Sequence, residues 1–244
     1  MATFNFFSNI LPDPVYKITD AGDQDSTGTA GPGFAGVNFR SVRDSQVSRT
    51  LSNRTIGRDS GKHAWEFSIK YNPMFRASIE PVLAFLDGRN PRTKPFYVVL
   101  PQYSKSQSDT FNTFASTYVL KAKALTLAGS SVLEVNTTVA FTTYPKPGDM
   151  FTVTDPLDAN HLKVYKVSAI ETPSRYQAGT TAPATTEMRL HIAPPLVRTI
   201  NSNTTVLTFI NPRFRVTAKN DIQEYELNTE GLYSYNLDVE ETLP

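Results

Sequence analysis

The feature that most constrains the fold is an alternation of apolar and polar side chains with a period of two residues. It begins near residue 37 and returns in the C-terminal part of the chain. The clearest runs contain Trp65, Phe67 and Ile69, and later Leu237 and Val239. This period places apolar groups on one face of a strand and polar groups on the other, as in half-buried antiparallel sheets. We therefore predict a mainly β protein.

Two segments interrupt this pattern early in the chain. Residues 53–63 are rich in turn-forming residues and predict a hairpin turn or a longer loop between two strands. Residues 74–89 place apolar side chains three and four positions apart, which predicts one short helix. We expect this helix to run from about Ser78, with Pro81 in the first turn, where its missing N–H costs nothing. Gly88 is expected to end it.

The sequence divides into three expected parts. Residues 1–36 form an N-terminal arm or loop: an apolar hook is followed by a Gly-rich polar stretch, residues 20–36, that we expect to be mobile. Residues 37–118 together with 205–244 are predicted to form a β-sandwich core domain. Residues 119–204 hold about five short strands and predict an inserted small β-barrel domain. The hook can dock on its own core or on a neighbouring subunit.

Composition and motifs argue against an enzyme. The absence of cysteine among the 244 residues excludes disulfides, thiolate metal sites and a cysteine nucleophile. The three histidines stand singly, and no nucleophile elbow, P-loop or dinucleotide-binding motif occurs. We expect no catalytic site, no metal and no cofactor. No apolar run is long enough to cross a membrane, and the first residues do not resemble a signal peptide, so we expect a cytoplasmic origin.

Charge gives no strong field over the whole molecule, because the formal net charge is only +1. Acidic residues cluster between positions 221 and 241. The simplest interpretation of this cluster is a solvated face.

Three stretches, taken in order, resemble structural proteins of the tail tip and baseplate of tailed bacteriophages, the group around the distal tail or baseplate hub protein. Residues 65–102 resemble that group's aromatic-led strand, its helix with an apolar-Phe-Leu-x-Gly-Arg segment, and a strand that opens with Phe. Residues 146–167, with Gly148 and Asp149 in a turn before a strand, and residues 191–196 are similar to its inserted barrel. Residues 231–243 are similar to its terminal strand.

This resemblance implies a structural protein of the virion tail, made in the host cytoplasm during assembly. It implies homo-oligomerisation into a ring, three- or six-fold, that contacts the tail tube, the hub and fibre or wedge proteins, with DNA only as passing cargo and no membrane insertion. Expected partner contacts are Phe4, Phe6, Phe7, Ile10 and Leu11. Expected channel-lining acids are Glu224, Glu226 and Glu230. Expected structural residues are Trp65, Gly88, Gly148 and Asp149.

Other functions stay open at this point. A carbohydrate-binding β-sandwich module of a baseplate would use exposed aromatic rings, but Trp65 lies in a strongly alternating strand and is expected in the core. A neck or tail-completion protein would share the structural role at another position of the virion. A tail-tip glycosidase or peptidase would need paired carboxylates or a metal triad, which the sequence does not indicate.

Overall fold

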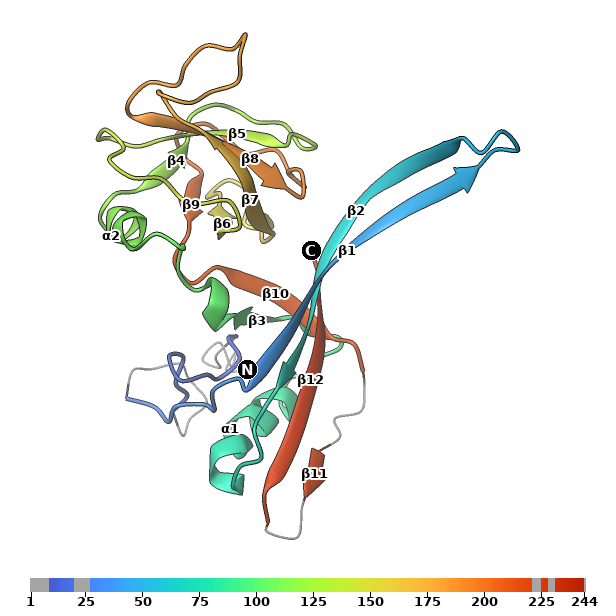
Figure 1. The fold of residues 1–244 in the computed structure, drawn as a ribbon. Coiled ribbons are helices and arrows are strands. Elements are labelled where there is room, and N and C mark those ends of the chain that lie inside the picture. Colours follow the sequence, from blue (N-terminus) through green and yellow to red (C-terminus); the bar gives the residue numbers. More distant parts are fainter. Residues whose placement is uncertain (1–8, 20–26, 221–224, 228–230, 244) are drawn as a thin grey trace. The chain divides into compact units, whose positions relative to one another are not determined.

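The computed structural model describes residues 9–19, 27–220, 225–227 and 231–243 (Figure 1). The chain forms two compact units, residues 1–98 with 215–242 and residues 99–214 with 243–244. The fold class is confirmed, because the described chain is mainly β and contains a sheet and a closed barrel.

The first unit is built on one sheet with the strand order β1-β2-β12-β10-β3, and β11 pairs with β12. The strands are β1 (Gly36–Arg49), β2 (Thr55–Lys70), β3 (Phe96–Val99), β10 (Arg213–Ala218), β11 (Tyr225–Leu227) and β12 (Tyr233–Glu241). The alternation predicted for Trp65, Phe67 and Ile69 is confirmed, since all three are buried. These three side chains form part of the apolar face of the sheet, and their burial stabilises this unit.

Helix α1 (Arg76–Asp87) is the predicted helix, but it begins two residues before Ser78. Pro81 consequently lies inside the helix and not in its first turn. Gly88 caps the C-terminal end, as expected, in a right-handed conformation (φ −65°). The left-handed residue that reverses the chain is Asn90, with φ 53°. The apolar face of α1, Ile79, Val82, Leu83 and Leu86, is buried.

Residues 9–11 of the N-terminal segment pack on their own unit. The amide of Leu11 donates to the carbonyl of Tyr97 in β3 (2.8 Å), and the amide of Tyr97 donates to Asn9 (2.7 Å). Part of the stretch that was expected to be mobile is tightly packed. A Cβ on Gly28 would lie 2.4 Å from the carbonyl carbon of Ile18. This glycine is therefore needed for the close approach of two backbones and not for flexibility.

The second unit contains a closed six-stranded barrel. In barrel order its strands are β4 (Leu120–Ala122), β5 (Val132–Asn136), β8 (Glu187–Ala193), β7 (Val164–Glu171), β6 (Met150–Thr154) and β9 (Val206–Thr208). A 3₁₀ turn, η1 (Pro101–Tyr103), and a second helix, α2 (Asp109–Thr117), precede the barrel. Only one helix was predicted. Phe111 and Phe114 of α2 belong to the barrel's apolar core, and the unit accordingly begins before the expected boundary at residue 119.

Across the described ranges, no helix is long and apolar enough to cross a membrane.

Candidate interaction surface: the hairpin arm

Strands β1 and β2 continue far beyond the sheet to which they belong (Figure 1). Their antiparallel register runs from Gly36 opposite Lys70 to Arg49 opposite Thr55. Strand β12, the other neighbour of β2, pairs with it only between Glu66 and Lys70. Within the described part of the chain, residues 41–62 therefore form a two-stranded ribbon with no third strand beside it. We call residues 41–62 the hairpin arm.

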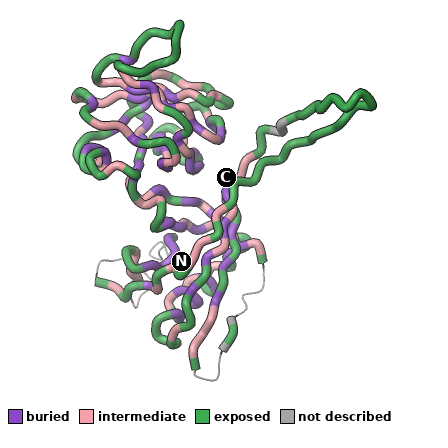
Figure 2. The backbone as a smooth tube through the Cα atoms, viewed as in Figure 1, coloured by how far each residue is buried: buried purple, intermediate pink, exposed green. Residues whose placement is uncertain are grey.

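Exposure changes abruptly where the arm leaves the sheet. Trp65 and Phe67 of β2 are buried, whereas every residue from 41 to 58 is exposed (Figure 2). Both faces of the ribbon therefore meet solvent. A lone two-stranded hairpin is marginally stable in water, because neither face buries apolar surface. A partner that covered one face would therefore stabilise the arm.

Local sequence explains the geometry of the arm. The turn is formed by residues 50–54: the amide of Thr50 donates to the carbonyl of Arg54 (3.0 Å), and Asn53 adopts φ 61°. Asparagine tolerates this left-handed conformation better than most residues. The expected turn at residues 53–63 is therefore displaced, because strand pairing resumes at Thr55. Gly61 lies opposite a register shift between Arg43 and Ser45, whereas Gly57 pairs regularly with Val47.

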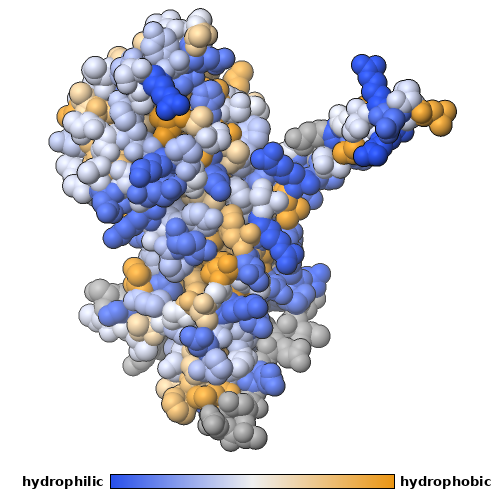
Figure 3. Space-filling model, viewed as in Figure 1, coloured by the Kyte–Doolittle hydropathy of each residue, from blue (hydrophilic) through white to orange (hydrophobic). Residues whose placement is uncertain are grey.

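The arm combines positive charge with exposed apolar side chains. Its sequence holds five basic and two acidic residues. Four apolar side chains are exposed along it: Val42, Val47, Leu51 and Ile56. Leu51, at the tip, is fully exposed. Figure 3 shows hydrophobic and strongly hydrophilic groups side by side on this projection. A mixture of apolar groups and arginine is typical of the centre of protein–protein contacts.

Sequence reasoning missed the arm, although the sequence carries a signal for it. The four exposed apolar residues stand four or five positions apart and so do not share one face of a strand. The register puts Val47 and Arg49 on one face, and Ile56 and Arg58 on the other. A strand without a continuous apolar face cannot be half-buried on its own sheet.

Of the five residues expected to contact partners, the structure describes two. Ile10 and Leu11 are buried in their own unit, while Phe4, Phe6 and Phe7 lie outside the described residues. Among the expected channel acids, Glu226 is exposed on β11, and Glu224 and Glu230 lie outside the described ranges.

The expected structural residues of the barrel and the sheet are well embedded. Asp149 is buried, and its carboxylate accepts hydrogen bonds from the amides of Gln107 (2.9 Å) and Lys146 (2.7 Å) and from the hydroxyl of Ser106. Gly148 needs a left-handed conformation (φ 101°) that favours glycine. Trp65 is buried, and its ring stacks on Phe39 with centroids 5.0 Å apart. It therefore offers no exposed platform for a sugar ring.

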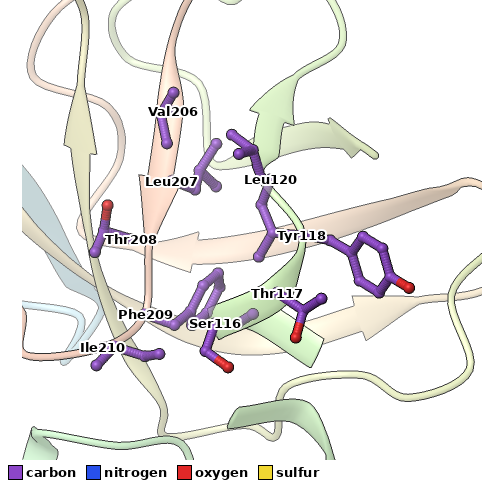
Figure 4. Close-up of a pocket in the computed structure, with 11 residues that line it drawn as sticks. Ser116, Thr117, Tyr118, Leu120, Val206, Leu207, Thr208, Phe209 and Ile210 are labelled. Carbon is purple, nitrogen blue, oxygen red and sulfur yellow. The ribbon is translucent and has the colours of Figure 1, made fainter. Parts of the chain in front are cut away.

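Two hollows lie on the barrel unit. One, of about 160 Å³, lies beside the end of α2 and is lined mostly by apolar and hydroxyl side chains from residues 115–120 and 206–210 (Figure 4). It contains no titratable group except Tyr118. A pocket of this composition lacks the convergent acid, base or nucleophile that a catalytic site needs.

The second hollow is open, about 310 Å³, and borders a charged network. Glu171 contacts Nε2 of His191 (2.8 Å) and accepts from Arg189 (3.1 Å), which also donates to Glu134 (2.8 Å). The hydrogen bond from His191 is the main cause that lowers the pKa of Glu171. Glu171 is thus held ionised with both oxygens engaged, the opposite of a poised general acid. No cluster of metal-binding side chains occurs among the residues that the structure describes.

No family model and no curated protein matches this sequence.

Proposed function

We propose that this chain is a structural assembly protein that associates with copies of itself through the hairpin arm. One observation carries the proposal: residues 41–58 are exposed on both faces of a two-stranded ribbon that bears apolar side chains. A partner that covers one face would supply the apolar burial that the arm lacks.

The proposed setting is the tail of a bacteriophage, as a ring component of the baseplate or tail tip. The resemblance in the sequence suggests this setting, and the combination of a sheet unit with an inserted barrel agrees with it. In that setting the tail tube, hub and fibre or wedge proteins would be further partners, and DNA would be passing cargo.

The test is the mass of the purified chain in solution, measured by light scattering over a range of concentrations. The matched variant replaces residues 44–62 by a two-residue Asn-Gly turn between Arg43 and His63. This change removes nearly all of the arm and keeps the register of the sheet. We expect the full chain to form oligomers and the shortened chain to stay monomeric, with unchanged circular dichroism. Equal masses for both chains would contradict the proposal.

A further inference from the structure

Charge is segregated along the sequence of the sheet unit. The hairpin arm, residues 41–62, carries a net charge of +3 from five basic and two acidic residues. Residues 221–241 contain seven acidic residues and no basic one. The net charge of the whole chain is therefore small, although the chain contains one segment of net positive charge and one of net negative charge.

The tip of the arm and the start of β12 belong to opposite ends of one sheet, because β12 runs from Tyr233, beside β11, to Glu241, which accepts from the amide of Trp65. Strand β2 starts next to the tip of the arm at Thr55 and ends at Lys70, which lies opposite Asn236. Beyond that point Met74 pairs with Tyr233, and β11 pairs with the first residues of β12. The arm and the β11–β12 hairpin thus leave the sheet in opposite directions (Figure 1).

The end that bears β11 offers both kinds of group that the arm would need. Glu226 on β11 lies opposite Ser234, and Asp238 lies four residues further along β12 on the same face, opposite Ser68 of β2. Both are exposed, and neither is held in an ion pair with another described residue. Phe75, next to the Met74–Tyr233 pair, is 68% exposed. An exposed aromatic ring at this end of the sheet and two exposed carboxylates on β11 and β12 complement a ribbon of arginines with an exposed leucine at its tip.

We propose that the arm of one copy docks, head to tail, on the β11–β12 end of a second copy of this chain. This inference rests on the proposed function and names its acceptor surface. The tip of the arm inserts at the acceptor, so that Arg49 on one face of the ribbon, Arg58 on the other face and Arg54 in the turn all lie near its carboxylates. Leu51 packs near Phe75. Because donor and acceptor are different surfaces, the contact is heterologous, so successive copies close into a ring or continue as a filament.

A charge exchange in the full-length chain tests this pairing. The arm-reversed variant carries Arg49→Glu, Arg54→Glu and Arg58→Glu, and the acceptor-reversed variant carries Glu226→Arg and Asp238→Arg. Each variant alone puts like charges at the contact, and we expect the concentration for half-assembly to rise at least about tenfold. In an equimolar mixture, each variant presents the complement of the other. We expect assembly to return, which a misfolded variant could not achieve.

The matched control places the same charge change on the barrel. Lys105, Lys121 and Lys146 are exposed there, and their replacement by glutamate should leave the half-assembly concentration within about twofold of that of the wild-type chain. A second variant, Phe75→Ser, should weaken assembly without altering its dependence on salt, because it removes an apolar contact only.

The outcomes separate this inference from the proposed function. If removal of the arm abolishes assembly but acceptor reversal does not, the acceptor is wrong and the proposed function stands. If removal of the arm leaves assembly intact, both proposals fail. A labelled DNA duplex serves as a probe for the alternative ligand. If it binds the wild-type chain but not the arm-reversed variant, while assembly is the same in both, the arm is a nucleic-acid contact and the inference is overturned.

Discussion

At the scale of single residues, the barrel contains a buried histidine that is held neutral. His161 is 1% exposed, and its Nε2 lies 2.7 Å from the hydroxyl of Tyr165. That hydroxyl accepts a hydrogen bond from the amide of Val197 (3.1 Å), so its own proton is available to His161 Nε2. Burial is the main cause that lowers the pKa of His161 to about 4, although Asp158 and Asp155 act in the opposite direction.

Acid should therefore destabilise the barrel through His161. Its pKa is about 6.5 in an unfolded chain and about 4 in the fold, so the unfolded chain binds the proton first. The stabilisation is complete above pH 6.5 and is lost as the pH falls towards 4, by up to about 3 kcal/mol. Urea unfolding at several pH values measures this loss. His161→Gln should flatten the dependence; equal slopes for His161→Gln and the wild type would contradict the assignment.

A buried carboxylate in the same unit gives a second prediction at this scale. Asp149→Ala removes the acceptor of the Gln107 and Lys146 amides and leaves buried donors without a partner. We expect a loss of about 3 kcal/mol or more in the free energy of unfolding, measured with urea. Asp109→Ala, which removes an exposed carboxylate, is the control. If both variants lose the same amount, the network around Asp149 does not stabilise the barrel.

Some of these residues can be predicted from the sequence and others cannot. Gly148 and Asp149 are expected to be structural because they resemble the Gly-Asp turn before a strand in the phage tail group, and the left-handed φ of Gly148 fits a turn. His161 could not be predicted in the same way. It is a single histidine in a polar turn, and only the folded chain brings Tyr165 and Asp155 around it.

At the scale of elements, the alternation of apolar and polar residues predicts strands, but it does not predict where the sheet ends. The buried half of β2 and the exposed arm are parts of one continuous strand, and only their partners differ. Helix α2 was missed for a related reason. It buries only Phe111 and Phe114, too few apolar residues to establish a helical period, and its start depends on a cap.

That cap can be tested directly. The side chain of Ser108 accepts from the amide of Phe111 (3.4 Å) at the first turn of α2, and Asp109 follows it. Ser108→Ala should lower the free energy of unfolding of the barrel unit by about 1 kcal/mol, while Ser108→Asp should preserve it. Ser116→Ala, near the other end of the helix, is the control in thermal and urea unfolding. A loss no larger than that of Ser116→Ala would mean that the cap does not help to define α2.

At the scale of the whole molecule, the two units differ in how the chain builds them. The barrel unit is essentially one continuous segment, residues 99–214, whereas the sheet unit is made from segments on both sides of it. The barrel closes on itself, so its strands form no long open edge. The ends of the inserted segment leave from β3 and β10, which are neighbours in the sheet.

This arrangement predicts that the units fold separately and that assembly belongs to one of them. Residues 99–214 expressed alone should unfold cooperatively and keep the acid sensitivity of His161, because every group around that side chain lies in the segment. A chain in which a short Gly-Ser linker joins residues 98 and 215 should retain the sheet and the arm. We expect it to form arm-dependent oligomers in light scattering, and the isolated barrel to remain monomeric. The proposed function would be contradicted if the isolated barrel formed oligomers. It would also be contradicted if the sheet unit stayed monomeric with intact circular dichroism, because assembly would then not depend on the arm.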